Sequence, residues 1–149
     1  MKIIATNKRA NYDYNITLKL DAGIVLTGSE VKSLRHNSSS IKESYVDEKG
    51  SELWLCNCFI KKYSSSSEKD MNPTRQRKLL VHKKELNKIL GSMKKEGFSI
   101  IPISMYFNDA GLVKLNIGLG KGKKKFDKRE SQKTKDWNKN KQRLLKNNF

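Results

Sequence analysis

Residues 99–119 have the sequence SIIPISMYFNDAGLVKLNIGL, in which apolar side chains recur at every second position on either side of a short polar segment. This period of two is typical of half-buried β-strands, so two strands are predicted, 99–107 and 113–119. Their inward-facing residues are expected to be Ile101, Ile103, Met105, Phe107, Val113, Leu115, Ile117 and Leu119. The turn-forming segment 108–111, NDAG, joins them as an antiparallel hairpin. Pro102 has no N–H group, which argues for an edge position or a bulge.

The same pattern predicts strands elsewhere in the chain. Apolar residues alternate over 12–20, at Tyr12, Tyr14, Ile16, Leu18 and Leu20. The turn-prone segment 21–23, DAG, is expected to end that strand. Residues 44–60 are predicted to form a second hairpin that turns at 48–51. Residues 1–11 are expected to be a short basic lead-in, and 63–78, with four serines, a mobile basic loop.

Two helices are predicted from capping and from helical period. Thr27 and Glu30 have the spacing of a capping box, and a short helix after them would turn Val31 and Leu34 inward. Residues 83–96 place apolar side chains at i, i+3, i+4 and i+7, and Gly97 follows as a C-cap. Gly97 therefore marks the expected end of the longer helix.

Five or six short antiparallel strands and two helices indicate a mainly β fold with helices, of the α+β type. A small closed or nearly closed barrel satisfies this pattern because it leaves no open strand edges. A partly open sheet with helices packed on one face is the alternative. Residues 1–120 are predicted to form one β-barrel core domain, and residues 121–149 a basic C-terminal tail.

The tail, residues 121–149, carries a large share of the charge. The chain has 32 Lys and Arg against 15 Asp and Glu, a net charge of +17, and the tail holds twelve of these cations and three of the acids. Such a segment buries too little apolar surface to offset the entropy of ordering it. It is expected to be disordered in solution and to order against a polyanion. The alternative is a solvated tail that only aids solubility.

The sequence offers little for catalysis or for metal binding. Cys56 and Cys58 match no common zinc spacing with His36 and His82, so two small buried hydrophobes in a reducing cytosol are preferred over a zinc site. The sequence has no GxxxxGK[ST] phosphate loop and no recognisable nucleophile arrangement. We therefore expect a protein that is not an enzyme and that uses no metal or cofactor.

Charge indicates the kind of partner. Cations cluster at 7–9, 75–78, 83–84 and 94–95 in addition to the tail. On a barrel these clusters predict a surface that follows the phosphates of RNA. An anionic membrane would also attract them, but the apolar stripe of the tail is thin. With no apolar run that could span a bilayer and no signal-type N-terminus, a cytoplasmic protein without membrane attachment is expected.

Five blocks of sequence, in this order and spacing, resemble the small protein B family. They are NKRANYDYNI (7–16), DAGIVLTGSEVKSLR (21–35), IKESYV (41–46), NPTRQRKLLVHKKEL (72–86) and GLGKGKKKFDKRE (118–130). The resemblance covers residues 7–147 and implies an oligonucleotide-binding-type β-barrel with flanking helices and a tail that is unstructured in solution.

The resemblance also implies an RNA site. In this family the barrel grips the tRNA-like domain of transfer-messenger RNA near its D-loop-like elbow. The resemblance implies that the RNA is gripped here by Asn7, Asp21, Leu80 and Lys114. The cations expected to contact the RNA as well are Lys8, Arg9, Lys78, Lys121, Lys123 and Lys124. A carboxylate repels phosphate, so Asp21 would accept from a base amino group or a 2′-hydroxyl. Its alternative role is that of a turn residue.

For the tail, the resemblance implies entry into the empty mRNA channel of the small ribosomal subunit, where it folds into a helix. Gly122 would be the hinge, and Phe126 would stack in the decoding centre, without the hydrogen bonding that a histidine there would allow. The implied tail positions are Gly122, Phe126, Asp127, Lys128, Arg129, Lys133, Trp137, Leu144 and Leu145.

The implied function is delivery of transfer-messenger RNA to stalled ribosomes in trans-translation. Expected partners are that RNA, the ribosome and, indirectly through the RNA, alanyl-tRNA synthetase and elongation factor Tu. The protein is expected to be a monomer. The alternative is a general ribosome-associated or architectural RNA-binding protein with the same basic surface.

Overall fold

The structure is a computed structural model, and it describes residues 1–36, 39–63, 72–94, 97–123, 129 and 135–140. Within these ranges a seven-stranded antiparallel sheet has the order β1-β8-β9-β2-β7-β5-β4. Its strands are β1 (Lys2–Thr6), β2 (Tyr14–Ile24), β4 (Tyr45–Lys49), β5 (Glu52–Cys56), β7 (Arg77–Leu80), β8 (Phe98–Phe107) and β9 (Val113–Gly122). A second small sheet pairs β3 (Ser39–Ser40) with β6 (Phe59–Ile60).

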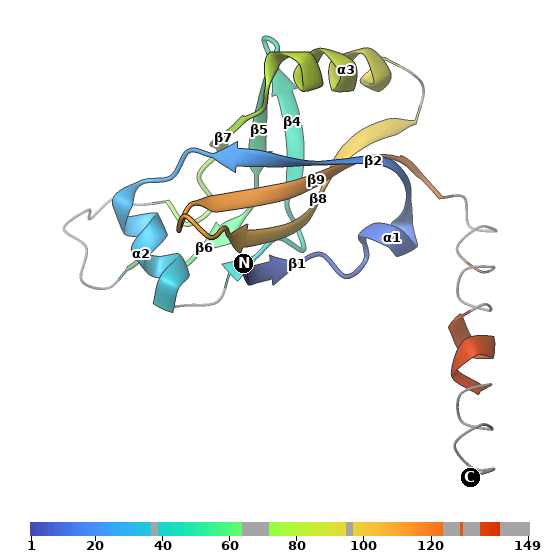
Figure 1. The fold of residues 1–149 in the computed structure, drawn as a ribbon, viewed down its shortest axis with the longest axis horizontal. Helices are drawn as coiled ribbons and strands as arrows, with labels where there is room; N and C mark the ends of the chain where they lie inside the picture. The colour runs from blue at the N-terminus through green and yellow to red at the C-terminus, as the bar shows by residue number, and fades with distance from the viewer. Residues whose placement is uncertain (37–38, 64–71, 95–96, 124–128, 130–134, 141–149) are drawn as a thin grey trace.

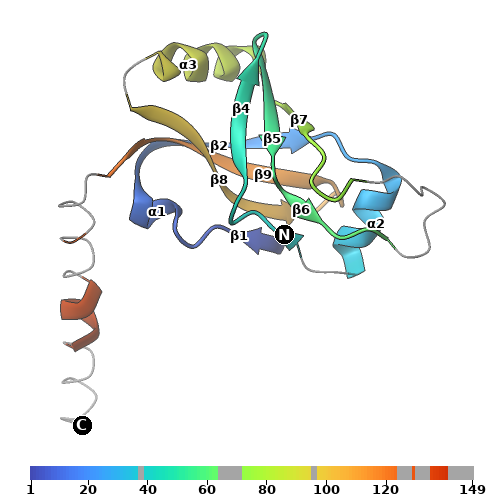
Figure 2. The ribbon, with the colours of Figure 1, turned by 180° about the vertical axis from the view of Figure 1, so that it is seen from behind.

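In the described part of residues 1–123, three helices lie around the sheet. They are α1 (Ala10–Asp13), α2 (Gly28–His36) and α3 (Lys83–Met93). Figures 1 and 2 show α3 beside the turn between β4 and β5, and α2 at the other end of the molecule. The predicted capping box is confirmed, because the N–H of Thr27 donates to Glu30 Oε1 (2.9 Å) and the N–H of Glu30 donates to Thr27 Oγ1 (3.2 Å).

The mainly β prediction is confirmed, whereas the closed barrel is not. Strand β1 pairs only with β8, and β4 pairs only with β5, so the described sheet has two open edges. The sheet curls enough to bring β4 near β8, yet no backbone ladder joins them. The sequence had suggested closure because a barrel removes exposed edges. Here the partly open alternative is the better description.

Two bulges rearrange the faces that the alternation had predicted. One lies between Ile16 and Leu18 in β2, and the other between Pro102 and Ser104 in β8. Each inserts one extra residue, so the inward and outward positions exchange along the strand. Pro102 thus sits at a bulge, as expected. The prediction that Ile101 shares a face with Met105 is wrong: a Cβ on Gly120 would lie 3.0 Å from Ile101 Cδ1, and Ile101 lies outside the core cluster that contains Met105.

The same change of face separates the apolar residues of β2. Leu18 and Leu20 pack against the main core, but Ile16 lies over Gly118 together with Ile103, on the opposite face. We call that opposite face of β8, β9 and β2 the outer face. Glycine is needed at Gly118 because a Cβ there would come within 2.8 Å of Ile103 and 2.9 Å of Ile16.

Three further predictions need correction. Residues 21–23 do not form a turn, because β2 continues to Ile24 and Ala22 is fully buried opposite Leu115. The N-terminal lead-in contains β1 and α1. The return strand of the second hairpin is interrupted after Cys56, where Asn57 has a φ of 58° that no regular strand accommodates. The predicted turn at 48–51 is present, with positive φ at Gly50 and Ser51.

A buried ion pair joins Glu30 of α2 to Arg77 of β7. Arg77 belongs to the segment 63–78 that was predicted to be a mobile basic loop. Glu30 and Arg77 are both fully buried, and Arg77 Nε donates to Glu30 Oε2 at 2.6 Å. Arg77 also donates to the carbonyl oxygens of Cys58 and Pro73, and Arg75 donates to Glu30 Oε1. Burial alone raises the pKa of Glu30, but the hydrogen bonds from Arg75 and Thr27 and the charge of Arg77 hold that pKa below its ordinary value.

Candidate nucleic-acid interface

Three of the four implied RNA-gripping residues lie close together near one end of the outer face. In the sheet register, Gly23 of β2 stands between Leu80 of β7 and Lys114 of β9. Asp21, two residues earlier in β2, projects from the same face because strand side chains alternate. Leu80 is 53% exposed, although it is apolar. The fold thus brings together Asp21, Leu80 and Lys114, which are far apart in sequence.

The Asp21 carboxylate is held in place by neighbours from two strands. Asn116, its register partner on β9, donates from Nδ2 to Asp21 Oδ1 at 3.0 Å. Burial raises the pKa of the Tyr106 hydroxyl on β8, and the neighbouring Asp21 carboxylate raises that pKa further. Asp21 is therefore a fixed, exposed acceptor on a sheet face, and its alternative role as a turn residue is excluded.

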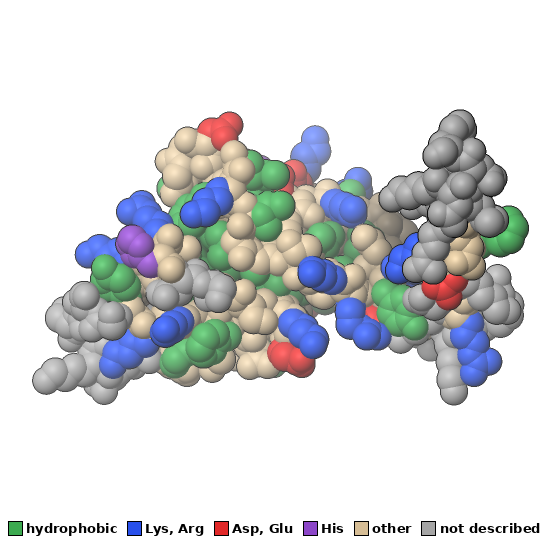
Figure 3. All heavy atoms as spheres, turned by 90° about the horizontal axis from the view of Figure 1, so that it is seen from below, with side chains coloured by type: hydrophobic (Ala, Val, Ile, Leu, Met, Phe, Trp, Pro, Cys, Tyr) green, Lys and Arg blue, Asp and Glu red, His purple; other side chains and the backbone are tan. Residues whose placement is uncertain are grey.

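The cations around this group lie at its margins. Lys78 is half-buried on β7 and its Nζ forms an ion pair with Glu52 at 3.1 Å. Arg35 at the end of α2 is exposed and lines the same hollow as Lys114. A view of the molecule from below shows many Lys and Arg side chains and few acids, with hydrophobic side chains between them (Figure 3).

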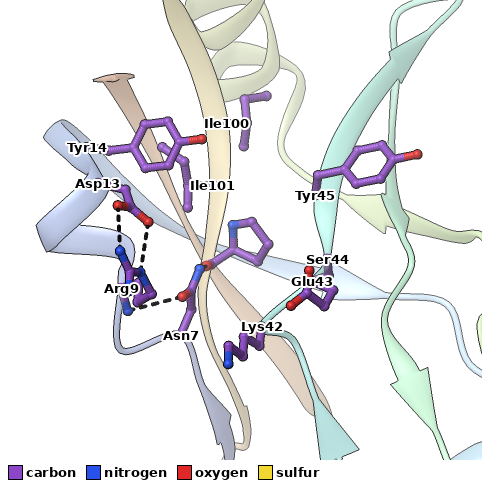
Figure 4. A pocket seen from close by; sticks show the side chains of 11 residues that line it. Asn7, Arg9, Asp13, Tyr14, Lys42, Glu43, Ser44, Tyr45, Ile100 and Ile101 are labelled. Carbon is purple, nitrogen blue, oxygen red and sulfur yellow. Dashed lines mark hydrogen bonds and ion pairs between the residues drawn. The ribbon is translucent and has the colours of Figure 1, made fainter. Parts of the chain in front are cut away.

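Asn7 lies apart from this group, and its side-chain amide is engaged within the fold. Its Nδ2 donates to the carbonyl oxygen of Pro102 (3.1 Å), and its Oδ1 accepts the N–H of Arg9 (3.3 Å). With Arg9, it lines a hollow of about 220 Å³ between α1, β4 and β8 (Figure 4). Asn7 thus fastens the bulge of β8 to the turn that carries Arg9.

Arg9 and Lys8 are exposed on that turn. The Arg9 guanidinium lies over the ring of Tyr12, 4.9 Å from its centroid, and pairs with Asp13 at 3.4 Å. The figure shows Arg9 and Asp13 facing each other beside Asn7 (Figure 4). The ring of Tyr12 and the carboxylate of Asp13 together hold the Arg9 guanidinium in place.

The start of the predicted tail is part of the sheet. Lys121 and Gly122 are the last residues of β9 and pair with Asn15 and Tyr14, and the N–H of Lys123 donates to the Asp13 carbonyl oxygen. Arg129 and Trp137 are exposed, and residues 135–140 are helical. The other tail positions, Lys124, Phe126, Asp127, Lys128, Lys133, Leu144 and Leu145, lie outside the described residues.

Several residues at this interface were not singled out from the sequence. In the sequence, Asn116 and Tyr106 look like ordinary strand residues. Only the sheet register shows that they lie near Asp21. Leu112 lies between the predicted turn 108–111 and the predicted strand 113–119 and was assigned to neither; it is 58% exposed at the edge of a hollow. A signal that could have indicated Asn116 is its polar side chain within an otherwise apolar alternation.

Other chemistries gain no support from the described part of the chain. There, no group of three or more His, Cys, Asp and Glu side chains could hold a metal ion, and no helix is long and apolar enough to cross a membrane. Cys56 and Cys58 are buried free thiols. Burial raises the pKa of Cys58, which disfavours the reactive thiolate.

The fold and the surface together define a small antiparallel β protein with a strongly basic face, a class that includes many nucleic-acid-binding proteins. The family model described as "SmpB protein" matches residues 4–147. The SsrA-binding protein of Ehrlichia canis (strain Jake) is 53% identical over 99% of this chain and all of its own length. That of Wolbachia pipientis subsp. Culex pipiens is 47% identical over the whole of both chains.

A solved structure agrees with these relatives. One of its chains superposes with a TM-score of 0.65 and 41% identity, covering 80% of this chain and 84% of its own length. It is described as "tmRNA-SmpB: a journey to the center of the bacterial ribosome". The chain therefore belongs to the SmpB protein family.

Proposed function

We propose that this protein binds the tRNA-like domain of transfer-messenger RNA and brings that RNA to stalled ribosomes in trans-translation. The observation that carries the proposal is the full-length similarity to SsrA-binding proteins, together with the fold shared with a chain solved as tmRNA-SmpB. No covalent step is involved. Binding and positioning of the RNA are the whole activity of the protein.

The outer face supplies a chemically mixed RNA contact. Asp21, fixed by Asn116, accepts a hydrogen bond from a 2′-hydroxyl or a base amino group, which a phosphate cannot offer. Lys114 meets the backbone, and the exposed Leu80 packs against a base. Arg9 and Lys8 provide a second phosphate contact on the α1 turn, and Asn7 supports that turn from behind. Together these contacts recognise the shape of the RNA, while the surrounding cations attract its phosphates.

For the tail we propose that the residues after Lys123 enter the vacant mRNA channel and fold there into a helix. The helical residues 135–140 and the exposed Trp137 support this, because a described part of the segment has helical geometry. Phe126 stacks in the decoding centre, and the basic residues meet ribosomal RNA. Alanyl-tRNA synthetase and elongation factor Tu are reached only through the RNA, and the protein acts as a monomer in the cytoplasm.

Replacing Lys114 with Ala is expected to weaken binding to the tRNA-like domain about tenfold, since a hydrogen bond to a charged group contributes about 1.5–3 kcal/mol. Lys88→Ala is the matched control, because Lys88 is an exposed lysine on α3 that carries the same charge away from the outer face. Affinities are measured by fluorescence anisotropy at fixed salt. Equal losses for both variants would show that only total charge matters and would remove Lys114 from the site.

A further inference from the structure

The short helix α1 contacts the tail at two separate places. At the start of the tail, the N–H of Lys123 donates to the Asp13 carbonyl oxygen at 2.8 Å. Farther along the tail, Lys135 Nζ lies over the ring of Tyr12, 5.9 Å from its centroid. Lys135 is the first residue of the helical stretch 135–140. Figure 1 shows α1 beside the end of β9, where the tail leaves the sheet. The same helix of the core therefore touches both the beginning of the tail and its described helical part.

The ring of Tyr12 is held in place by the core itself. Tyr12 is half-buried, and its N–H donates to the Arg9 carbonyl oxygen at 3.1 Å. The Arg9 guanidinium lies 4.9 Å from the ring centroid and pairs with Asp13 at 3.4 Å. Ala10, the first residue of α1, is only 2% exposed, which seats the helix in the fold. The ring therefore has a defined position that does not depend on the tail.

Two cations share this one ring. Arg9 and Lys135 are both attracted by its π-electrons, and they repel each other. The ion pair of Arg9 with Asp13 offsets part of that repulsion. Because Lys135 is exposed, its contact with the ring is weak and cannot fold the tail. It can, however, select among the directions that an already formed helix could take from the core.

We propose that Tyr12 is a positioning residue for the tail: its ring seats Lys135 and so sets the direction in which the tail helix leaves the core. The hydrogen bond from Lys123 to Asp13 fixes the start of the tail, and the ring of Tyr12 fixes a second point twelve residues later. The inference rests on the proposed entry of the tail into the mRNA channel. It gives a role to two residues, Tyr12 and Lys135, that the family resemblance did not single out.

The test locates the tail on the ribosome. An Fe(II) chelate is attached to the full chain at Asn140→Cys, the last residue of the helical stretch and an exposed one. Cys56 and Cys58 are 2% and 0% exposed, so the chelate reacts at the introduced thiol. The labelled protein is bound with transfer-messenger RNA to ribosomes stalled at the end of an mRNA. Hydroxyl radicals from the chelate then cut the ribosomal RNA that lies near it.

Two pairs of variants change the contact from its two sides. On the core, Tyr12→Leu removes the ring, and Tyr12→Phe keeps a ring that still attracts a cation. On the tail, Lys135→Gln removes the seated cation, and Lys139→Gln removes an equally exposed cation of the same helical stretch that has no described contact with Tyr12. Lys135 and Lys139 are exposed, so the tail pair decides the question even if a change at Tyr12 disturbs α1. The melting temperature and the affinity for the tRNA-like domain are measured for every variant.

We expect the chain with Tyr12 and Lys135 intact, Tyr12→Phe and Lys139→Gln to give the same confined set of cuts. Tyr12→Leu and Lys135→Gln should weaken those cuts about two- to fivefold, the factor for loss of an exposed cation–π contact, and add cuts elsewhere. If Lys135→Gln leaves the pattern unchanged, or changes it no more than Lys139→Gln does, the inference is wrong. If the chain with both residues intact gives no cuts along the mRNA channel, the proposed role of the tail itself is overturned, independently of α1.

Discussion

Replacing Arg77 with Ala is expected to lower the free energy of unfolding by about 3–5 kcal/mol, the typical cost of removing one partner of a buried ion pair. The change leaves the Glu30 carboxylate fully buried without its fully buried counter-charge. It also leaves the carbonyl oxygens of Cys58 and Pro73 without their donor. Urea unfolding followed by circular dichroism measures the loss.

Arg75→Ala is the matched control, because Arg75 also donates to Glu30 but its side chain is 38% exposed. Water replaces much of the hydrogen bonding that Arg75 supplies to Glu30, so we expect this variant to lower the free energy of unfolding by about 1 kcal/mol. Since the pKa of Glu30 is lowered in the folded state, the stabilisation is fully present above its ordinary value of 4.5 and fades as pH falls through the lowered pKa. A loss for Arg77→Ala no larger than for Arg75→Ala would contradict this account.

Deleting residues 124–149 is expected to abolish tagging of stalled nascent chains while leaving a folded core that still binds the RNA. The deleted segment begins just after the hydrogen bond from Lys123 to Asp13, so every ladder of the sheet is kept. On the ribosome, in contrast, nothing remains to fill the vacant mRNA channel. The melting temperature, the affinity for the tRNA-like domain and tagging in a reconstituted translation system are measured together.

A longer deletion, of residues 121–149, serves as the control for this boundary. It removes the pairing of Lys121 with Asn15 and Phe98 and of Gly122 with Tyr14, so we expect a lower melting temperature than for the 124–149 deletion. Tagging that persists in the 124–149 deletion would exclude the proposed role of the tail. Loss of folding in that deletion would instead show that the tail belongs to the core.

Local signals in the sequence predicted the local structure well. The capping box at Thr27 and the helical period from residue 83 both correspond to observed helices, although α3 ends at Met93 with Lys94 as its C-cap, and not at the predicted Gly97. Alternation located β2, β8 and β9 as strands but could not show the two bulges, because an extra residue in a strand leaves no mark in composition. It therefore assigned Ile16, Ile101 and Ile103 to the wrong face.

Features that depend on long-range pairing could not be predicted. Asp21 and Gly23 resemble a turn when they are considered alone, yet β9 and β7 pair with them and keep the strand extended. Arg77 had the appearance of a loop cation, and only the fold shows that it is fully buried against Glu30. The resemblance to a family selected Asp21, Leu80 and Lys114, and the sheet register then placed them together.

The central claim is that the outer face reads the shape of one RNA in addition to attracting phosphate. Its most direct test is a titration of the full chain against its cognate transfer-messenger RNA and against an unrelated structured RNA, each at low and at moderate salt. We predict tight binding to the cognate RNA that persists at moderate salt while binding to the unrelated RNA is lost. Equal affinities that fall together as salt rises would indicate counterion release alone and would contradict the account.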